Sequence, residues 1–197
     1  MLRVTVCVSG GGTNLQAILD AIADKSLTNV EIVRVLSNNA DAYALERAKA
    51  AGVPTVVVSR KDYPDGNAYD DALLQTVEAD NPDIVVLAGF LVKIPFCMVR
   101  RFPGRILNVH PSLIPAFCGV GYYGLKVHEQ ALLRGVKVSG ATVHIVDEDM
   151  DTGPILLQKA VEVKEGDTPE TLQKRIMEEA EWVLLPKAIQ LMADRML

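Results

Sequence analysis

The chain has 197 residues, 49% of them hydrophobic and 5% aromatic, which one compact domain accounts for. Its net charge of −5 and pI near 5.2, with acids and bases interspersed, argue against a nucleic-acid surface built on phosphate neutralisation. We therefore expect the partners to be small molecules. The three cysteines are far apart and form no CxxC pair, the N-terminus lacks a signal-peptide core, and no apolar stretch approaches ~18 residues. These features indicate a cytoplasmic domain without a membrane segment.

The first apolar run, VTVCVS, leads into the glycine-rich turn SGGGTN (9–14) and then into the helical pattern NLQAILDAIAD. Such a turn offers backbone amides and a helix dipole to an anion, so we expect a phosphate there, with a tight turn alone as the alternative. Thr13 and Asn14 can cap the helix and donate to phosphate oxygens. The turn lacks a Gly-Lys-Ser/Thr, and Leu15 replaces the third glycine of the dinucleotide fingerprint, which argues against ATP and NAD.

Short β-branched runs then alternate with helical patterns. EIVRVLS precedes AYALERAKAAG, TVVVS precedes AYDDALLQTVEAD, and DIVVLA precedes a proline-interrupted segment. The run at 83–88 is apolar at nearly every position, which predicts a central strand with both faces covered. We expect Asp41 to cap the second helix and Gly52 to be its left-handed stop.

The later elements are RILNV, VHEQALLRG, ATVHIVD, ILLQKAVEV and a long helical segment that begins with Thr168 as cap and Pro169. Alternating strands and helices predict the α/β class. We expect a mostly parallel, Rossmann-like open twisted sheet with helices on both faces, in a single domain of residues 1–197. The irregular segment between Pro111 and Lys126 has a length that is often functional.

The strand RILNV runs directly into NVHPSLIP (108–115). Ligands of open parallel sheets bind beyond the carboxyl ends of strands, where Asn108 and His110 share a face. Pro111 and Pro115 stiffen this strand exit. An amide donor beside an imidazole that exchanges a proton near neutral pH suits acyl transfer. The alternative is a turn-capping Asn beside a buried structural His.

The segment DEDMDTGPI (147–155) carries four carboxylates in its first five residues. One of them can orient and polarise His110, although such charge runs are often solvated loops. The spacing lacks the EF-hand glycine and terminal glutamate, so we expect no metal. There is no GxSxG elbow, and Cys7 lies in an apolar strand, so direct transfer between two bound substrates is simpler than a covalent acyl-enzyme.

In this order and at these separations, SGGGTN, LAGFLVKI, NVHPSLIP and DxDTGPI closely resemble the phosphoribosylglycinamide formyltransferase family over essentially the whole chain. The resemblance implies formyl transfer from the co-substrate 10-formyltetrahydrofolate to the amine of 5′-phosphoribosylglycinamide (GAR) in purine biosynthesis. It also implies a monomer or homodimer, with a phosphate-binding N-terminal half and a folate-binding, catalytic C-terminal half. Similar methionyl-tRNA formyltransferases and formyltetrahydrofolate deformylases are expected to carry a further domain. A deformylase-like hydrolase and a non-enzymatic nucleotide-binding module remain the alternatives.

Site residues follow from the same resemblance. Asn108 and His110 are expected to stabilise the formyl oxyanion and move protons, and Asp151 to orient His110. The expected GAR contacts are Gly11, Gly12, Thr13, Asn14, Pro111 and Glu181. The folate pocket is expected to be lined by Phe90, Leu91, Val92, Lys93, Ile94, Val146, Asp147 and Asp149.

Two features depart from the family pattern. The segment AFCGVGYYGLKVHEQA is longer and richer in Gly and Tyr than usual, and is either a lid over the folate or a surface insertion. Glu178 stands where some members place Lys or Gln, which leaves the GAR ribose contacts open. Among the remaining histidines, we expect His128 to cap a helix or contact solvent and His144 to be a satisfied buried residue. Cys118 is expected to be inert.

Overall fold

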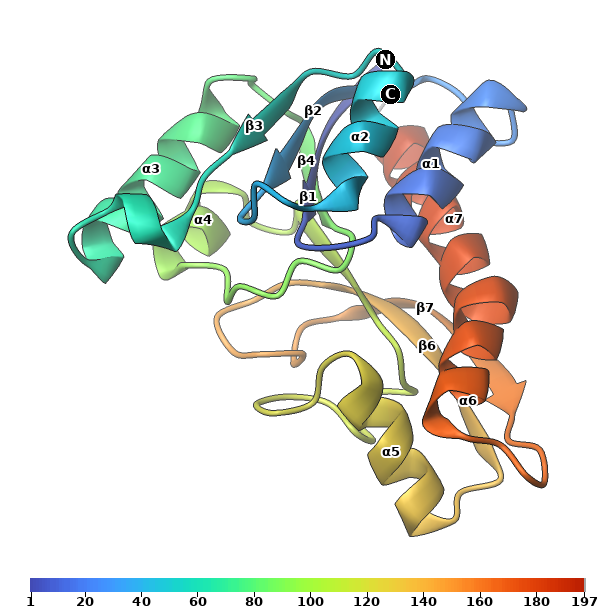
Figure 1. Cartoon of the computed structure of the whole chain (residues 1–197). Coiled ribbons are helices and arrows are strands. Elements are labelled where there is room, and N and C mark those ends of the chain that lie inside the picture. Colours follow the sequence, from blue (N-terminus) through green and yellow to red (C-terminus); the bar gives the residue numbers. More distant parts are fainter. Residues whose placement is uncertain (197) are drawn as a thin grey trace.

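A computed structural model describes residues 1–196 and shows one twisted sheet with helices on both faces (Figure 1). Within these residues the sheet has seven strands in the order β3-β2-β1-β4-β5-β6-β7. Strands β1 to β5 are parallel, whereas β6 runs antiparallel to β5 and β7 antiparallel to β6. The strands are β1 (Leu2–Val8), β2 (Val30–Ser37), β3 (Thr55–Val57), β4 (Ile84–Leu87), β5 (Ile106–His110), β6 (Val138–Ile145) and β7 (Ile155–Glu162).

Helices connect the strands and cover both faces of the sheet. The last helical segment contains one π-helical turn (Met177–Glu181) between α6 and α7. The helices are α1 (Thr13–Ala23), α2 (Tyr43–Ala50), α3 (Gly66–Glu78), α4 (Phe96–Arg101), α5 (Leu125–Arg134), α6 (Pro169–Ile176) and α7 (Trp182–Met196), with a short 3₁₀ turn at Arg60–Asp62. The predicted α/β class and the predicted strands and helices are therefore confirmed.

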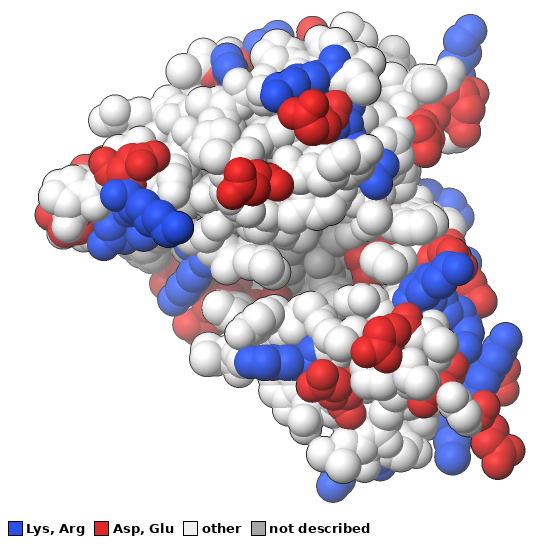
Figure 2. Space-filling model, in the orientation of Figure 1, with Lys and Arg blue, Asp and Glu red and all other residues white. Residues whose placement is uncertain are grey.

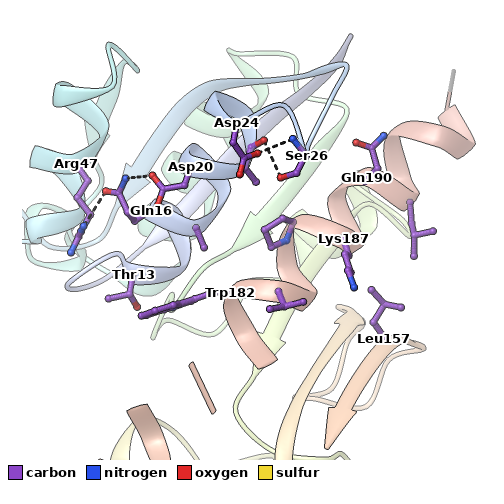
Figure 3. Close-up of a pocket in the computed structure, with 15 residues that line it drawn as sticks. Thr13, Gln16, Asp20, Asp24, Ser26, Arg47, Leu157, Trp182, Lys187 and Gln190 are labelled. Carbon is purple, nitrogen blue, oxygen red and sulfur yellow. Dashed lines mark hydrogen bonds between the residues drawn. The ribbon is translucent and has the colours of Figure 1, made fainter. Parts of the chain in front are cut away.

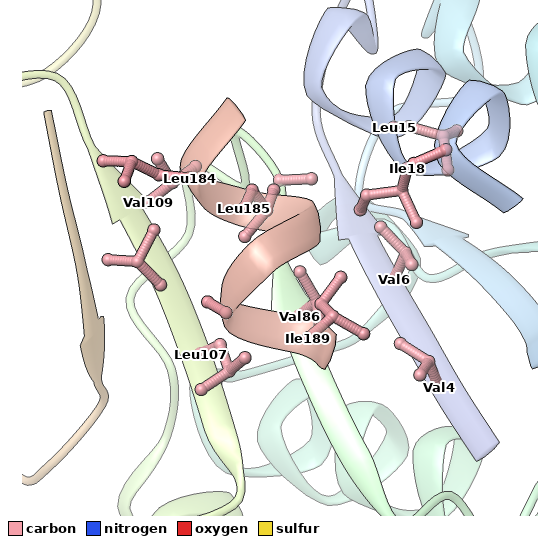
Figure 4. Packing of buried hydrophobic residues seen from close by; sticks show 14 of the residues in the cluster. Val4, Val6, Leu15, Ile18, Val86, Leu107, Val109, Leu184, Leu185 and Ile189 are labelled. Atoms are coloured by element: carbon pink, nitrogen blue, oxygen red, sulfur yellow. The ribbon is translucent and has the colours of Figure 1, made fainter. Parts of the chain in front are cut away.

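The side chains of the central strand β4 contribute to two hydrophobic cores, one on each face of the sheet. Ile84 and Val86 belong to the core beneath α1 and α7, while Val85 and Leu87 belong to the core beneath α3 and α4. All four side chains are buried, as the apolar run predicted, because helices cover both faces of a parallel sheet. Figure 4 shows the larger core, in which α7 and α1 lie on the strands through Leu184, Leu185, Ile189, Leu15 and Ile18.

Two of the predicted helix ends are confirmed. Gly52, which follows the C-cap residue Ala51 of α2, has φ +72°, and Thr168 forms a capping box with Thr171 at the start of α6. The prediction that Asp41 caps α2 is wrong, because Ala42 is the N-cap and no side chain bonds there. The amide of Ala44 instead donates to the Gly10 carbonyl at 3.0 Å, so a neighbouring loop satisfies the helix end.

The surface carries acidic and basic side chains interspersed on the face seen in Figure 2, as the composition indicated. This face is hollowed between the part that holds α1 to α4 and the part that holds α5, β6 and β7 (Figures 1 and 2). Within residues 1–196, no helix combines the length and apolar character needed to cross a membrane.

Candidate active site

A cavity of about 520 Å³ lies at the carboxyl ends of β4 and β5, a volume typical of small-molecule sites. The segments that form its wall are far apart in sequence: the loop after β4, the end of β5, the loop before α5, the loop between β6 and β7, and the π-helical turn. The sheet switches here from parallel to antiparallel pairing. The position of the cavity beyond the carboxyl ends of parallel strands agrees with the prediction from the sequence.

Strand β5 presents Asn108 and His110 to this cavity and turns Leu107 and Val109 into the core. This alternation follows from the two-residue period of a strand and confirms that the polar pair shares a face. Asn108 lies opposite His144 in the antiparallel register of β5 and β6. The pairing therefore brings a third polar side chain to the cavity.

Asp151 lies at the centre of the polar cluster. Its Oδ2 accepts a hydrogen bond from the Gly119 amide at 2.9 Å and lies 3.5 Å from Nδ1 of His110. Its Oδ1 lies 3.4 Å from both Nε2 of His144 and Nδ2 of Asn108. The structure thus brings Asn108, His110 and Asp151 together, as the family resemblance implied.

The charges of this cluster are set by opposing effects. Burial alone would raise the pKa of Asp151, but contacts with His144, His110 and the Gly119 amide outweigh it and lower the pKa below its ordinary value. Burial lowers the pKa of His110 despite the opposing effects of Asp151 and the Phe117 carbonyl. An ionised carboxylate therefore faces an imidazole that is neutral near pH 7.

His110 is also held by the loop that follows it. Its Nε2 donates to the Phe117 carbonyl at 2.8 Å, and Gly121, Tyr122, Tyr123 and Gly124 line the cavity. The Gly- and Tyr-rich segment is therefore a wall of the site and not a surface insertion. Sequence reasoning did not identify the two tyrosines, because their positions depend on the path of a loop without a regular pattern.

His144 is buried, as predicted, and Nδ1 donates to the Ile145 carbonyl at 2.9 Å. Its Nε2, however, lies 3.1 Å from Nδ2 of Asn108 and so belongs to the cluster. Sequence reasoning did not predict this contact, because it depends on the register of two strands that lie far apart in the chain.

The prediction for His128 is wrong. The N-cap of α5 is Gly124, with no side-chain cap, and His128 is fully buried within the first turns of α5 where it lines the cavity. Neither ring nitrogen has a hydrogen-bond partner among the described residues. Burial, together with the nearby His110, lowers the pKa of His128 to about 4.

Asn14 and Glu181 form a second polar pair on the cavity wall. Nδ2 of Asn14 donates to Oε2 of Glu181 at 2.6 Å, and burial raises the pKa of Glu181 despite this bond. Asn14 is thus inside α1 and does not cap it. Glu178 is exposed, lies 3.8 Å from Nζ of Lys174 and is not part of the cavity wall.

The rest of the glycine turn lies apart from this cavity. Gly12 is the left-handed N-cap of α1, and Thr13, predicted as a cap, is the first residue of the helix. Thr13 lines a separate cavity of about 790 Å³ between α1 and α7 (Figure 3). Gly11 and Gly12 line neither cavity, and Nε of Arg47 donates to the Gly11 carbonyl at 2.8 Å. Of the expected GAR contacts, the structure brings Asn14, Pro111 and Glu181 to the cavity with the catalytic candidates.

All of the expected folate contacts line the cavity. Phe90 and Ile94 are buried, whereas Leu91 is exposed. The amide of Leu91 donates to Oγ of Ser9 at 2.8 Å, which ties this wall to the glycine turn. The residues that share the wall are Phe90, Leu91, Val92, Lys93, Ile94, Val146, Asp147 and Asp149.

The chain is similar over most of its length to known formyltransferases. The formyl transferase family model matches residues 2–189. The chain is 46% identical over 98% of its length to the trifunctional purine biosynthetic protein adenosine-3 of Bos taurus, of which it spans only 18%. It is 38% identical over 98% of its length to the phosphoribosylglycinamide formyltransferase of Escherichia coli, covering 88% of that protein. The crystal structure of glycinamide ribonucleotide transformylase 1 from Symbiobacterium toebii superimposes with a TM-score of 0.92 at 47% identity, over 98% of this chain and 88% of that one.

Proposed function

This chain belongs to the formyl transferase family, and on that basis we propose that it transfers the formyl group of 10-formyltetrahydrofolate to the amine of GAR. The observation that carries the proposal is the convergence of Asn108, His110 and Asp151 on one cavity with an apolar wall. The names of the E. coli and S. toebii relatives support GAR as the acceptor. Membership of a transferase family argues against the non-enzymatic binding module.

In the proposed reaction, the GAR amine attacks the formyl carbon, and the bond from that carbon to N10 of the folate breaks. Negative charge develops on the formyl oxygen. Asn108 has two amide hydrogens, which face Asp151 and His144, and the one that faces His144 would turn to this oxygen while the other stays toward Asp151. One such donor typically contributes about 3 kcal/mol of transition-state stabilisation.

His110 would take the proton that the amine loses and return it to N10 of the leaving folate. In the structure Nε2 carries the hydrogen that it donates to the Phe117 carbonyl, so it can accept a proton only after this bond breaks and the ring hydrogen moves to Nδ1, which faces Asp151. We therefore expect the segment around Phe117 to shift when substrates bind. Asp151 would hold the ring through Nδ1 and stabilise the imidazolium that forms.

GAR would lie along Asn14, Pro111 and Glu181, with its ribose beside the Glu181 carboxylate. Its phosphate would reach the N-terminus of α1 at Gly11, Gly12 and Thr13, where free amides and the helix dipole favour an anion. Because these three residues lie outside the cavity wall, the phosphate would sit at the cavity edge.

The folate would occupy the other wall. Phe90, Val92, Ile94 and Val146 offer apolar surface for a flat pterin, and the carboxylates of Asp147 and Asp149 offer acceptors for its N–H groups. Leu91 and Lys93 lie at the exposed edge of this wall. Both substrates are small molecules, the reaction uses no metal, and a monomer and a homodimer are equally compatible with it. The free thiols suit a reducing cytoplasm, where we place the reaction.

The first experiment is a spectrophotometric assay of purified protein with 10-formyltetrahydrofolate, recording folate release with and without GAR. We expect release only when GAR is present. Release at the same rate without GAR would replace the transferase by a deformylase-like hydrolase. No release in either arm would contradict formyl transfer to GAR and point to another acceptor.

A further inference from the structure

His128 is a buried polar residue without a partner. It is fully buried in α5, and both ring nitrogens lack a hydrogen bond among the described residues. Nearly all buried polar groups in proteins are hydrogen-bonded, so an exception that faces a ligand site calls for a partner from outside the chain. Of the other described side chains with unpartnered buried atoms, only Asn14 lines the same cavity.

The ring of His128 is a neutral imidazole near pH 7. Its pKa is lowered to about 4 because the ring is buried and His110 lies nearby. A neutral imidazole carries one N–H donor and one acceptor nitrogen, and it does not serve as a base at this low pKa. It can therefore hold a polar ligand but does not exchange protons with it.

The surroundings of His128 favour one of the two substrates. Helix α5 packs against α6, and Gln173 of α6, followed by Met177 and Glu181 of the π-helical turn, continues the cavity wall from His128. The wall assigned to the folate comes from the loops after β4 and β6 instead. The unpartnered Oδ1 of Asn14 also lies on the side of Glu181, because Asn14 is bonded to it.

Resting on the proposed function, we infer that His128 is a specificity-determining residue that hydrogen-bonds GAR, through its ring N–H to an oxygen of the ribose or glycinamide group. GAR has ribose hydroxyl oxygens on one side of its glycosidic nitrogen and a carbonyl oxygen on the other. The neutral ring of His128 can donate a hydrogen bond to any of these oxygens without a change of protonation. An apolar molecule in this place would leave the donor and the acceptor unpaired, so the site would reject it.

The test is the substitution His128→Phe, which keeps a flat ring and removes both polar atoms. GAR and 10-formyltetrahydrofolate are titrated separately into the variant and the unaltered protein by calorimetry, and the melting temperature is measured without ligand. We expect GAR to bind at least tenfold more weakly and the folate to bind within twofold. The ligand-free melting temperature should be unchanged or higher, because an unpaired buried group has been removed.

A matched control is Ser139→Ala, which removes another unpartnered buried polar atom at a site away from the cavity. It should leave both affinities unchanged. His128→Asn and His128→Gln place an amide near Nδ1 or Nε2, so recovery of GAR affinity in one of them would identify the nitrogen that binds. These two variants also replace His128→Phe if that protein does not fold.

GAR affinity within twofold of the unaltered protein in His128→Phe, or equal weakening of GAR and folate, would overturn the inference. Failure of the unaltered protein to bind GAR would instead contradict the proposed function. The two failures are therefore distinguishable in one set of titrations.

Discussion

At the scale of single residues, the site depends on one carboxylate. Asp151 has φ +59°, an uncommon backbone conformation for a residue other than glycine, and it contacts Asn108, His110, His144 and the Gly119 amide. A strained residue with so many polar contacts is typical of a functional position. Its removal should therefore disturb several groups at once.

We predict that Asp151→Asn lowers turnover at least a hundredfold while the protein stays folded. The amide keeps the size of the side chain but not the charge that stabilises the His110 imidazolium. Steady-state kinetics with a melting curve measure this, and Glu165→Gln, at an exposed position outside the cavity wall, is the control that keeps near-full activity. Near-full activity of Asp151→Asn would remove this residue from the mechanism.

The pH dependence of kcat/KM tests the role of His110. A general base must be neutral, so activity should fall as the pH drops through the pKa of His110, which burial places below the ordinary 6.5. Asp151 raises that pKa, so the residual activity of Asp151→Asn should fall at a still lower pH. If the acid limb of the pH profile lies at the same pH in Asp151→Asn as in the unaltered protein, the proposed contact between Asp151 and His110 is contradicted.

At the scale of elements, the glycine turn and α2 support each other. A Cβ on Gly12 would lie 2.5 Å from Cβ of Ala44, and its φ of +72° disfavours any side chain. The Gly10 carbonyl accepts from Ala44, and Arg47 holds the Gly11 carbonyl. The conformation of the turn is therefore fixed by the helix beside it.

We predict that Gly12→Val raises the KM for GAR much more than the KM for folate, because the turn must move away from α2. It should also lower the free energy of unfolding by more than about 1 kcal/mol. Gly10→Ala, whose Cβ meets nothing within 4 Å, is the control. Equal increases in both KM values would count against phosphate binding at this turn.

The elements that the sequence predicted correctly are those with a strong local pattern. Apolar β-branched runs located all seven strands, and Gly52 and Thr168 marked helix ends, because these signals act within a few residues. Asp41 failed as a cap because a carbonyl distant in sequence satisfies that helix end. His128 was misread, and the contact of the correctly predicted His144 with Asn108 was not foreseen, for the same reason: their neighbours come from packing and strand register that no local pattern encodes.

At the scale of the whole molecule, stability depends on two cores separated by one sheet. Ile189 of α7 is fully buried in the larger core, with Leu15 and Ile18 of α1 nearby (Figure 4). We predict that Ile189→Ala lowers the free energy of unfolding by about 2–5 kcal/mol through lost burial and a cavity. Urea denaturation measures this, and the exposed Lys187→Ala should change it little. A loss below about 1 kcal/mol would mean that α7 contributes little to the core.

The antiparallel pairing of β5 with β6 has a consequence for how the chain tolerates insertions and deletions. Asn108 and His144 face each other because of strand register, and one added residue within either strand would turn its polar side chains into the core. Among the described residues, the segment between them hydrogen-bonds to the cluster at Phe117 and Gly119. Added residues beyond these two contacts would leave the polar cluster where it is. The length of this loop can therefore drift among relatives, while the lengths of the two strands cannot.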